Sequence, residues 1–200
     1  MEKQLKNISH ATAILRAAAD QGRVSGDLAA DLQMGGRVRY QNATMEIRKD
    51  VSGFGSGTNK LIDSNTEKLT GISDFRGNRL AKKEAFVATH VQVQYGAGEN
   101  KEIPAIALTH DLEDNLLAGK LIFSVRGNKI FEMPMGDLVA DAAERNANEK
   151  GFELALPVII PDDEQIDIEV ELGQGASVGS TPGTKKVLRA AFHGVKTVAN

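Results

Sequence analysis

The chain has 200 residues, of which 41% are hydrophobic and 26% charged, a composition typical of one globular domain with a small appendage. It contains no cysteine, which excludes disulfides, thiolate metal sites and cysteine nucleophiles, and its net charge of −3 argues against a nucleic-acid binder that is basic overall. No apolar run reaches the roughly 20 residues of a transmembrane helix, so we expect no membrane span. The first ten residues lack the apolar segment of a secretory signal.

The first 36 residues differ in pattern from the rest and predict two helices. Apolar residues recur at helical spacing up to about residue 19, with Ser9 as a candidate N-cap and Gly22 as a candidate stop. A second short helix is predicted over 27–34 and ends at Gly35–Gly36, the one candidate domain boundary.

We therefore expect an N-terminal helical arm over residues 1–36 and a β-sandwich domain over residues 37–200. The arm either packs on its own domain or reaches a neighbouring chain, and the sequence leaves both open. If it reaches a neighbour, its apolar side chains would carry the contact. These candidate assembly residues are Leu5, Ile8, Ile14 and Leu15.

From Val38 onward apolar and polar residues alternate, which predicts strands with one buried face. About eight strands are predicted, with short helices only as insertions at 112–118 and 137–149. This order favours a mainly β fold, an antiparallel two-sheet β-sandwich, over a doubly wound parallel sheet. The clearest predicted strands are 43–48, 86–95, 103–108, 120–125, 130–133, 152–160, 166–172 and a final strand around 188–192.

Several local features refine these strands. Val87 is expected to share a face with Val91 and Val93, and Leu156 to share a face with the apolar residues at even positions of 152–160. Pro157 predicts an edge or a bulge in that last strand. The segment RGNK at 126–129 predicts a hairpin turn, and residues 52–84 predict a long loop.

No motif specifies a reaction. The glycine cluster at 53–57 lacks the spacing of a P-loop or a dinucleotide fingerprint and is interpreted as a surface loop. The histidines at 10, 90, 110 and 193 are scattered, so we expect no metal site, no cofactor and no catalytic residue.

Charged clusters are interpreted first as solvated surface. The acidic clusters at 111–114 and 162–164 are expected to be exposed turns, with an adventitious cation site as the alternative. The basic stretch at 76–83 is expected to be a solvated loop, with contact to phosphates as its alternative.

Four segments carry the strand alternation most clearly: AFVATHVQVQYG, GKLIFSVRGNKIFEMPM, FELALPVIIPDDEQIDIEVELG and VLRAAFHGVKTV. In pattern they resemble the middle and final strands of jelly-roll virion proteins of bacteriophages, over about residues 84–198. The irregular stretch at 52–84 departs from that pattern.

The resemblance implies a jelly-roll-like sandwich that acts as a self-assembling capsid protein, not an enzyme. Its partners would be copies of itself and other virion proteins, and it would be made in the host cytoplasm and reside in the virion. Contact with nucleic acid stays open. The alternative is a β-sandwich module that binds a ligand or carbohydrate. Carbohydrate-binding modules usually stack exposed aromatic rings on sugars, and the absence of tryptophan and the presence of only two tyrosines, Tyr40 and Tyr95, argue against this alternative.

Overall fold

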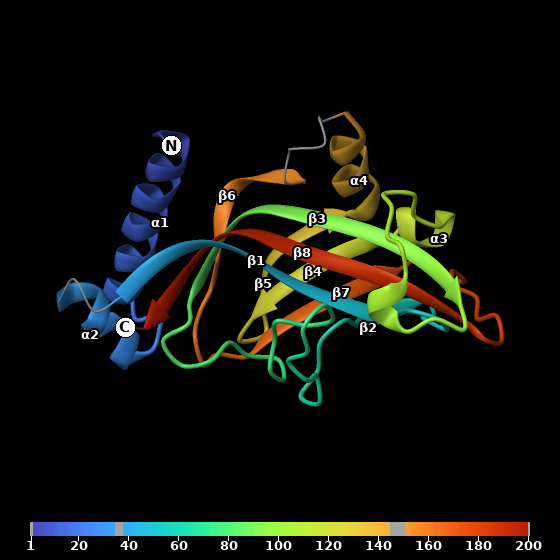
Figure 1. Cartoon of the computed structure of the whole chain (residues 1–200), viewed down its shortest axis with the longest axis horizontal. Coiled ribbons are helices and arrows are strands. Elements are labelled where there is room, and N and C mark those ends of the chain that lie inside the picture. The colour runs from blue at the N-terminus through green and yellow to red at the C-terminus, as the bar shows by residue number, and fades with distance from the viewer. Residues whose placement is uncertain (1, 35–37, 145–150, 200) are drawn as a thin grey trace.

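The computed structural model describes residues 2–34, 38–144 and 151–199, which form a mainly β fold with a few helices (Figure 1). The strands are β1 Val38–Asp50, β2 Gly57–Lys60, β3 Phe86–Glu99, β4 Lys120–Val125, β5 Asn128–Pro134, β6 Phe152–Ile160, β7 Ile166–Leu172 and β8 Thr184–Ala199. The helices are α1 Glu2–Asp20, α2 Gly26–Met34, α3 Asp114–Leu117, α4 Met135–Glu144 and the 3₁₀ turn η1 Ile103–Ala105.

The strands form two antiparallel sheets of four. Sheet A has the order β1-β8-β3-β6, and sheet B has the order β2-β7-β4-β5. Each strand pairs with the strand that lies equally far from the β4–β5 turn: β1 with β8, β2 with β7, β3 with β6 and β4 with β5. The pairing is therefore nested about one hairpin in the middle of the chain.

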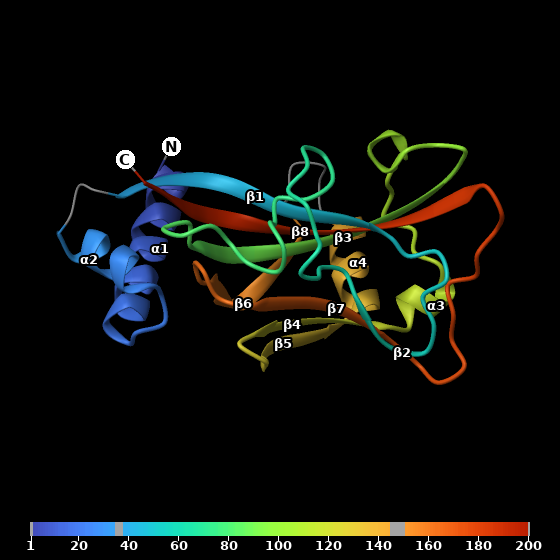
Figure 2. The same cartoon turned by 90° about the horizontal axis from the view of Figure 1, so that it is seen from below.

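The two sheets face each other across one apolar core, in a sandwich-like arrangement of two layers (Figure 2). Phe123 of β4 and Phe192 of β8 are both fully buried, and their ring centroids lie 5.7 Å apart across the layers. Phe131 of β5 stacks on Phe123 at 5.6 Å. Aliphatic side chains from the inner faces of both sheets fill the rest, as the two-residue alternation predicts.

A β-bulge in β3 changes which face its side chains take. The pairing of β3 with β8 is regular up to Ala88 and resumes at His90, so Thr89 is an extra residue. Val91 and Val93 lie in the core between the sheets, whereas Val87 packs on the opposite, outer face of sheet A. The prediction that Val87 shares their face is wrong, because alternation assumes a continuous pleat.

The edge strand β6 is irregular where it lies beside the bulge of β3. Its pairing with β3 stops at Val158 and resumes at Glu153, which leaves four residues of β6 opposite Thr89. Pro157 lies in this interruption, as expected of a proline in an edge strand. Leu156 is 80% exposed, so its predicted place on the buried face is wrong.

The central hairpin forms as predicted. Arg126 and Gly127 both have positive φ angles, 52° and 74°, which is the conformation of a type I′ turn between β4 and β5. The predicted strand over 103–108 is wrong. Pro104 lies in the first turn of η1 instead, where its fixed φ is compatible with a helical turn.

The helices differ from prediction mainly at their ends. The first helix begins at Glu2, so Ser9 lies inside it and is not its cap. The second matches its prediction within one residue. Helix α4 begins at Met135, and the end predicted at residue 149 lies outside the described residues. No helix among the described residues has the length and apolar character to cross a membrane.

The predicted long loop is confirmed, and part of it protects the edge of sheet A. It contains β2 and runs past the outer edge of β1. There the Arg48 N–H donates to the Ile72 carbonyl at 2.7 Å, and Asp74 and Glu46 are joined by two hydrogen bonds. Covering the backbone of an edge strand in this way blocks uncontrolled pairing with other chains.

An exposed ion-pair group on sheet B makes stability depend on pH. Hydrogen bonds from Lys120 and Lys129 lower the pKa of Glu132 to about 2. Because the folded pKa lies below the ordinary value of 4.5, this contribution is complete above about pH 4.5 and is lost as the pH falls towards 2.

We therefore expect Glu132→Gln to reduce the difference in urea midpoint between pH 7 and pH 3. Glu67→Gln is the control, because Glu67 is exposed and pairs with no cation of the described residues. The assignment is wrong if both variants keep the pH dependence of the unaltered chain.

Candidate interaction site

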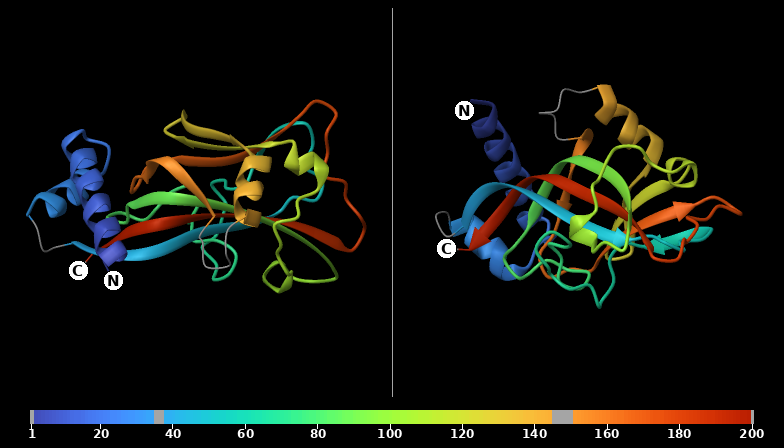
Figure 3. Two further views of the ribbon diagram at one scale, coloured as in Figure 1. Left: turned by 90° about the horizontal axis from the view of Figure 1, so that it is seen from above. Right: turned by 45° about the vertical axis from the view of Figure 1, so that its right-hand side comes forward.

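The two N-terminal helices pack on the outer face of sheet A at one end of the sandwich (Figure 3). We call residues 2–34 the helical unit. A second apolar core, separate from the one between the sheets, joins this unit to all four strands of sheet A. The residues that the sheet contributes are Val38, Tyr40, Val87, Ile159 and Val195.

The predicted assembly residues lie on this helical unit. Leu15 is fully buried in the second core, and Ile8 and Ile14 are partly buried against it. Leu5 lies in α1, and its side chain is outside the described part of the structure. The described contacts of these side chains are made within their own chain. The boundary predicted at Gly35–Gly36 lies outside the described residues.

A buried carboxylate fastens the helical unit to the sandwich. Asp162, in the β6–β7 turn, is fully buried and accepts hydrogen bonds from Ser25 N–H at 2.9 Å and Ser25 Oγ at 2.5 Å. Ser25 precedes α2, and its Oγ also accepts from the Leu28 N–H, the geometry of an N-cap. The carboxylate therefore lies at the positive end of α2, where a negative charge is favourable.

The same carboxylate also binds the long loop. The backbone N–H of Lys83 donates to Asp162 Oδ2 at 2.8 Å, and the Lys83 ammonium lies 2.7 Å from Asp31 of α2. Asp162 thus joins three segments that are far apart in the sequence. The prediction that residues 162–164 form a solvated turn is wrong for Asp162, although Asp163 is exposed.

We expect Asp162→Asn to lower the free energy of unfolding by about 2 kcal/mol, because an amide accepts less strongly and places a donor against the Ser25 and Lys83 donors. Asp163→Asn makes the same chemical change at the next, exposed position and should stay within about 0.5 kcal/mol of the unaltered chain. Urea unfolding measures both. Hydrogen exchange should also become faster in residues 2–34 of Asp162→Asn only. Equal effects of the two substitutions would contradict the fastening role.

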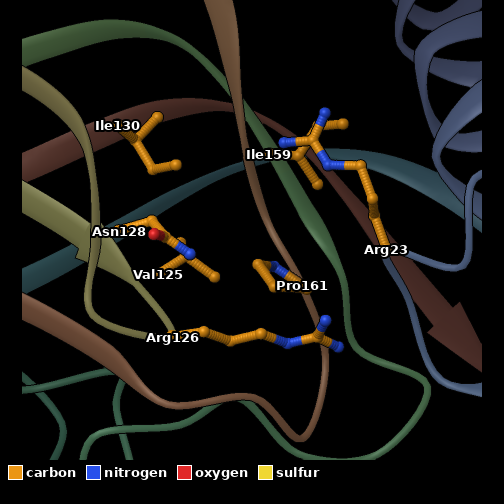
Figure 4. A pocket seen from close by; sticks show the side chains of 7 residues that line it. All are labelled: Arg23, Val125, Arg126, Asn128, Ile130, Ile159 and Pro161. Carbon is orange, nitrogen blue, oxygen red and sulfur yellow. The ribbon is translucent and has the colours of Figure 1, made fainter.

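A pocket lies where the helical unit meets the sandwich (Figure 4). Its volume is about 150 Å³. Arg23 reaches it from the turn between α1 and α2, and Arg126 reaches it from the β4–β5 turn. The remaining lining is mostly aliphatic, with one amide, and comes from both sheets: Val125, Asn128, Ile130, Ile159 and Pro161.

Further cations lie beside this pocket, around the turn that follows Pro161. Arg126 pairs with Glu164, and the hydrogen bond from Arg126 lowers the pKa of Glu164. The side chains of Arg79 and Lys82 are more than half exposed and lie 3.9 and 4.0 Å from Asp163, so both pairs are weak. No carboxylate of the described residues pairs with Arg23.

Three histidines, His90, His110 and His193, form hydrogen bonds on or beside sheet A, and His10 lies in α1. His193 Nδ1 lies 2.9 Å from Thr44 Oγ1, and His193 and His90 are neighbours across β8 and β3. His110 lies 3.4 Å from the Gln92 amide. Within residues 2–34, 38–144 and 151–199, no three His, Asp or Glu side chains are grouped so that they could hold a metal ion.

The glycine cluster at 53–57 is a connection between the sheets. It leads from β1 of sheet A to β2 of sheet B. Gly53 donates to the Val178 carbonyl, and Val178 donates back to the Phe54 carbonyl at 2.8 Å. These bonds fix the cluster against the loop before β8, as expected of a structural connection.

No protein-family model matches the sequence, and no curated protein is significantly similar to it.

Proposed function

We propose that the chain is a jelly-roll structural subunit of a viral particle, of the bacteriophage type, whose function is to bury surface against copies of itself. The observation that carries this proposal is the nested pairing of the eight strands, β1 with β8, β2 with β7, β3 with β6 and β4 with β5.

Nested pairing is what results when one long antiparallel hairpin is rolled up. The additional pairings β3–β8 and β4–β7 join the turns of the roll and divide the strands into two sheets of four. Eight-stranded double-sheet jelly rolls of this type occur in viral capsid proteins, lectins and cupins. Because one fold serves several functions, the choice among these classes depends on the surfaces.

The surfaces favour protein contacts. Leu156 on the edge strand β6 is 80% exposed and Met34 at the end of α2 is 66% exposed. Single exposed apolar side chains are common on protein surfaces, so these two enter the proposal as contact points for another copy and not as its evidence. The helical unit is fastened by Asp162 and by a core of its own, so it adds a defined surface to one end of the sandwich. The proposed partners are other copies of the chain and other virion proteins.

Sedimentation velocity of the purified full chain from about 1 to 100 μM, the range in which moderate interfaces associate, tests the proposal. We expect the mass to grow with concentration, and electron microscopy to show regular assemblies with one subunit spacing. A chain that remains monomeric over the whole range would overturn the proposal.

A further inference from the structure

The junction between the helical unit and the sandwich combines cations with aliphatic side chains. We define the cationic surface as Arg23, Arg79, Lys82 and Arg126, which surround the pocket of Figure 4 and the turn after Pro161. Among the described residues, the carboxylates that pair with these cations are Asp163 and Glu164, and Asp162 in the same turn is buried. Since the whole chain has a net charge of −3, the remaining surface is acidic on balance.

An acidic and partly apolar surface lies around α3, near the end of the long axis that is opposite the helical unit (Figure 1). We call Asp111, Asp114 and Leu117 the acidic end. Both aspartates are exposed and pair with no cation of the described residues, and Leu117 is 40% exposed.

The neighbouring Glu113 is already engaged. It accepts a hydrogen bond from Tyr95 at 2.5 Å and lies 2.7 Å from the Lys186 ammonium. Partial burial raises the pKa of Glu113, but these two partners outweigh it and hold the pKa below its usual value. The two aspartates are therefore the carboxylates that this end offers to a partner.

We infer that the cationic surface binds the acidic end of a second copy of the chain, so that subunits associate head to tail. The inference rests on the proposed function and names the contact that would build the assembly. Asp111 and Asp114 face Arg23 in the neighbouring copy, and Leu117 enters the aliphatic pocket. A cavity of about 150 Å³ accepts a group as large as benzene, which suits a leucine side chain.

The aliphatic lining favours a protein over nucleic acid as the occupant. Ile130 is 39% exposed at the pocket, and desolvated aliphatic groups beside arginine are typical of protein interfaces. Nucleic-acid affinity comes from phosphate contacts and needs no apolar pocket. Because the two surfaces are different and separate, the contact is heterologous and produces rings when the rotation closes, or filaments when it does not.

Charge reversal tests the contact in the full chain by sedimentation velocity. Arg23→Glu and Asp114→Arg should each weaken self-association at least about tenfold, because each places like charges opposite each other. An equal mixture of the two variants should restore it, since each reversed surface then meets its complement on the other variant. The double variant in one chain should associate like the unaltered chain. Lys68→Glu, an exposed cation outside both surfaces, is the control and should change nothing.

The outcomes separate this inference from the proposed function. If the unaltered chain associates but the single variants associate equally well, or the mixture fails to restore association, the head-to-tail contact is wrong and the proposed function stands. If Arg23→Glu leaves association unchanged but abolishes binding of a single-stranded DNA probe, the cationic surface serves nucleic acid and the inference is overturned. If the unaltered chain is monomeric, both are overturned. Circular dichroism checks that each variant is folded.

Discussion

Replacing Gly194 by alanine is expected to lower the free energy of unfolding by about 4 kcal/mol. Losses of this size result only from severe steric clashes or packing defects. Gly194 lies in β8 beside the bulge of β3, in register with Ala88. A Cβ atom at this position would lie 1.9 Å from the Val87 carbonyl oxygen and 2.9 Å from its carbon. Both are backbone atoms of a central strand, so the two strands must separate or the bulge must rearrange.

The matched control is Gly173→Ala. A Cβ atom at Gly173 has no neighbour within 4 Å, and this substitution should change the stability by no more than about 0.5 kcal/mol. Urea unfolding followed by circular dichroism measures both, and failure of Gly194→Ala to fold agrees with the prediction when Gly173→Ala folds normally. Equal urea midpoints for the two variants would show that β3 and β8 do not approach as described.

Phe192→Ala is expected to cost about 3–5 kcal/mol, because it opens a cavity between the sheets. The Phe192 ring is fully buried and lies within 5.7 Å of Phe123 and 6.4 Å of Phe131, measured between ring centroids. Leu156→Ala removes a large apolar side chain that is 80% exposed and should change stability by less than about 0.5 kcal/mol.

A double-mutant cycle makes this test specific to the contact between the sheets. Phe123→Ala and Phe192→Ala should be less costly together than the sum of the single losses, with a coupling energy of about 0.5–1.5 kcal/mol for an aromatic pair. Strictly additive losses would indicate that the two rings do not meet, and the sheets would then not share this part of the core.

The strands that were predictable are those whose pleat is uninterrupted. In β7, Ile166, Ile168 and Val170 alternate with acidic residues, and all three are fully buried as the alternation requires. The hairpin at Arg126–Gly127 was predictable because Gly127 readily adopts the positive φ angle that the turn needs, whereas the positive φ of Arg126 is uncommon for a residue with a side chain. The strand β7 and the β4–β5 turn are determined by residues close together in the sequence, and such local patterns can be recognised in a single sequence.

The faces of β3 and β6 were not predictable beyond the bulge. Inserting Thr89 moves Val87 to the outer face of sheet A, where the helical unit covers it. The sequence does not reveal such a bulge, because an apolar residue such as Val87 is compatible with either face of the sheet. The exposed Leu156 has the same origin, since the interruption in β6 frees it from the pleat.

Most of the candidate interaction site could not be predicted from the sequence either. Ser25 and Asp162 are 137 positions apart, and an acidic residue in a turn is normally solvated, so nothing local distinguishes Asp162 from Asp163. The pocket likewise combines Arg23, Arg126 and Ile159 from three separate segments. The apolar helical face was visible in the sequence, but its partner on sheet A required the bulge that brings Val87 outward.

Hydrogen–deuterium exchange on the full chain, followed peptide by peptide at low and at high concentration, tests most directly that this sandwich works by packing against its own copies. Association is expected to slow exchange in residues 111–117 and 125–130, which belong to the two proposed contact surfaces, and to leave the buried strands β7 and β8 unchanged. Identical exchange at every concentration throughout the chain would contradict the account.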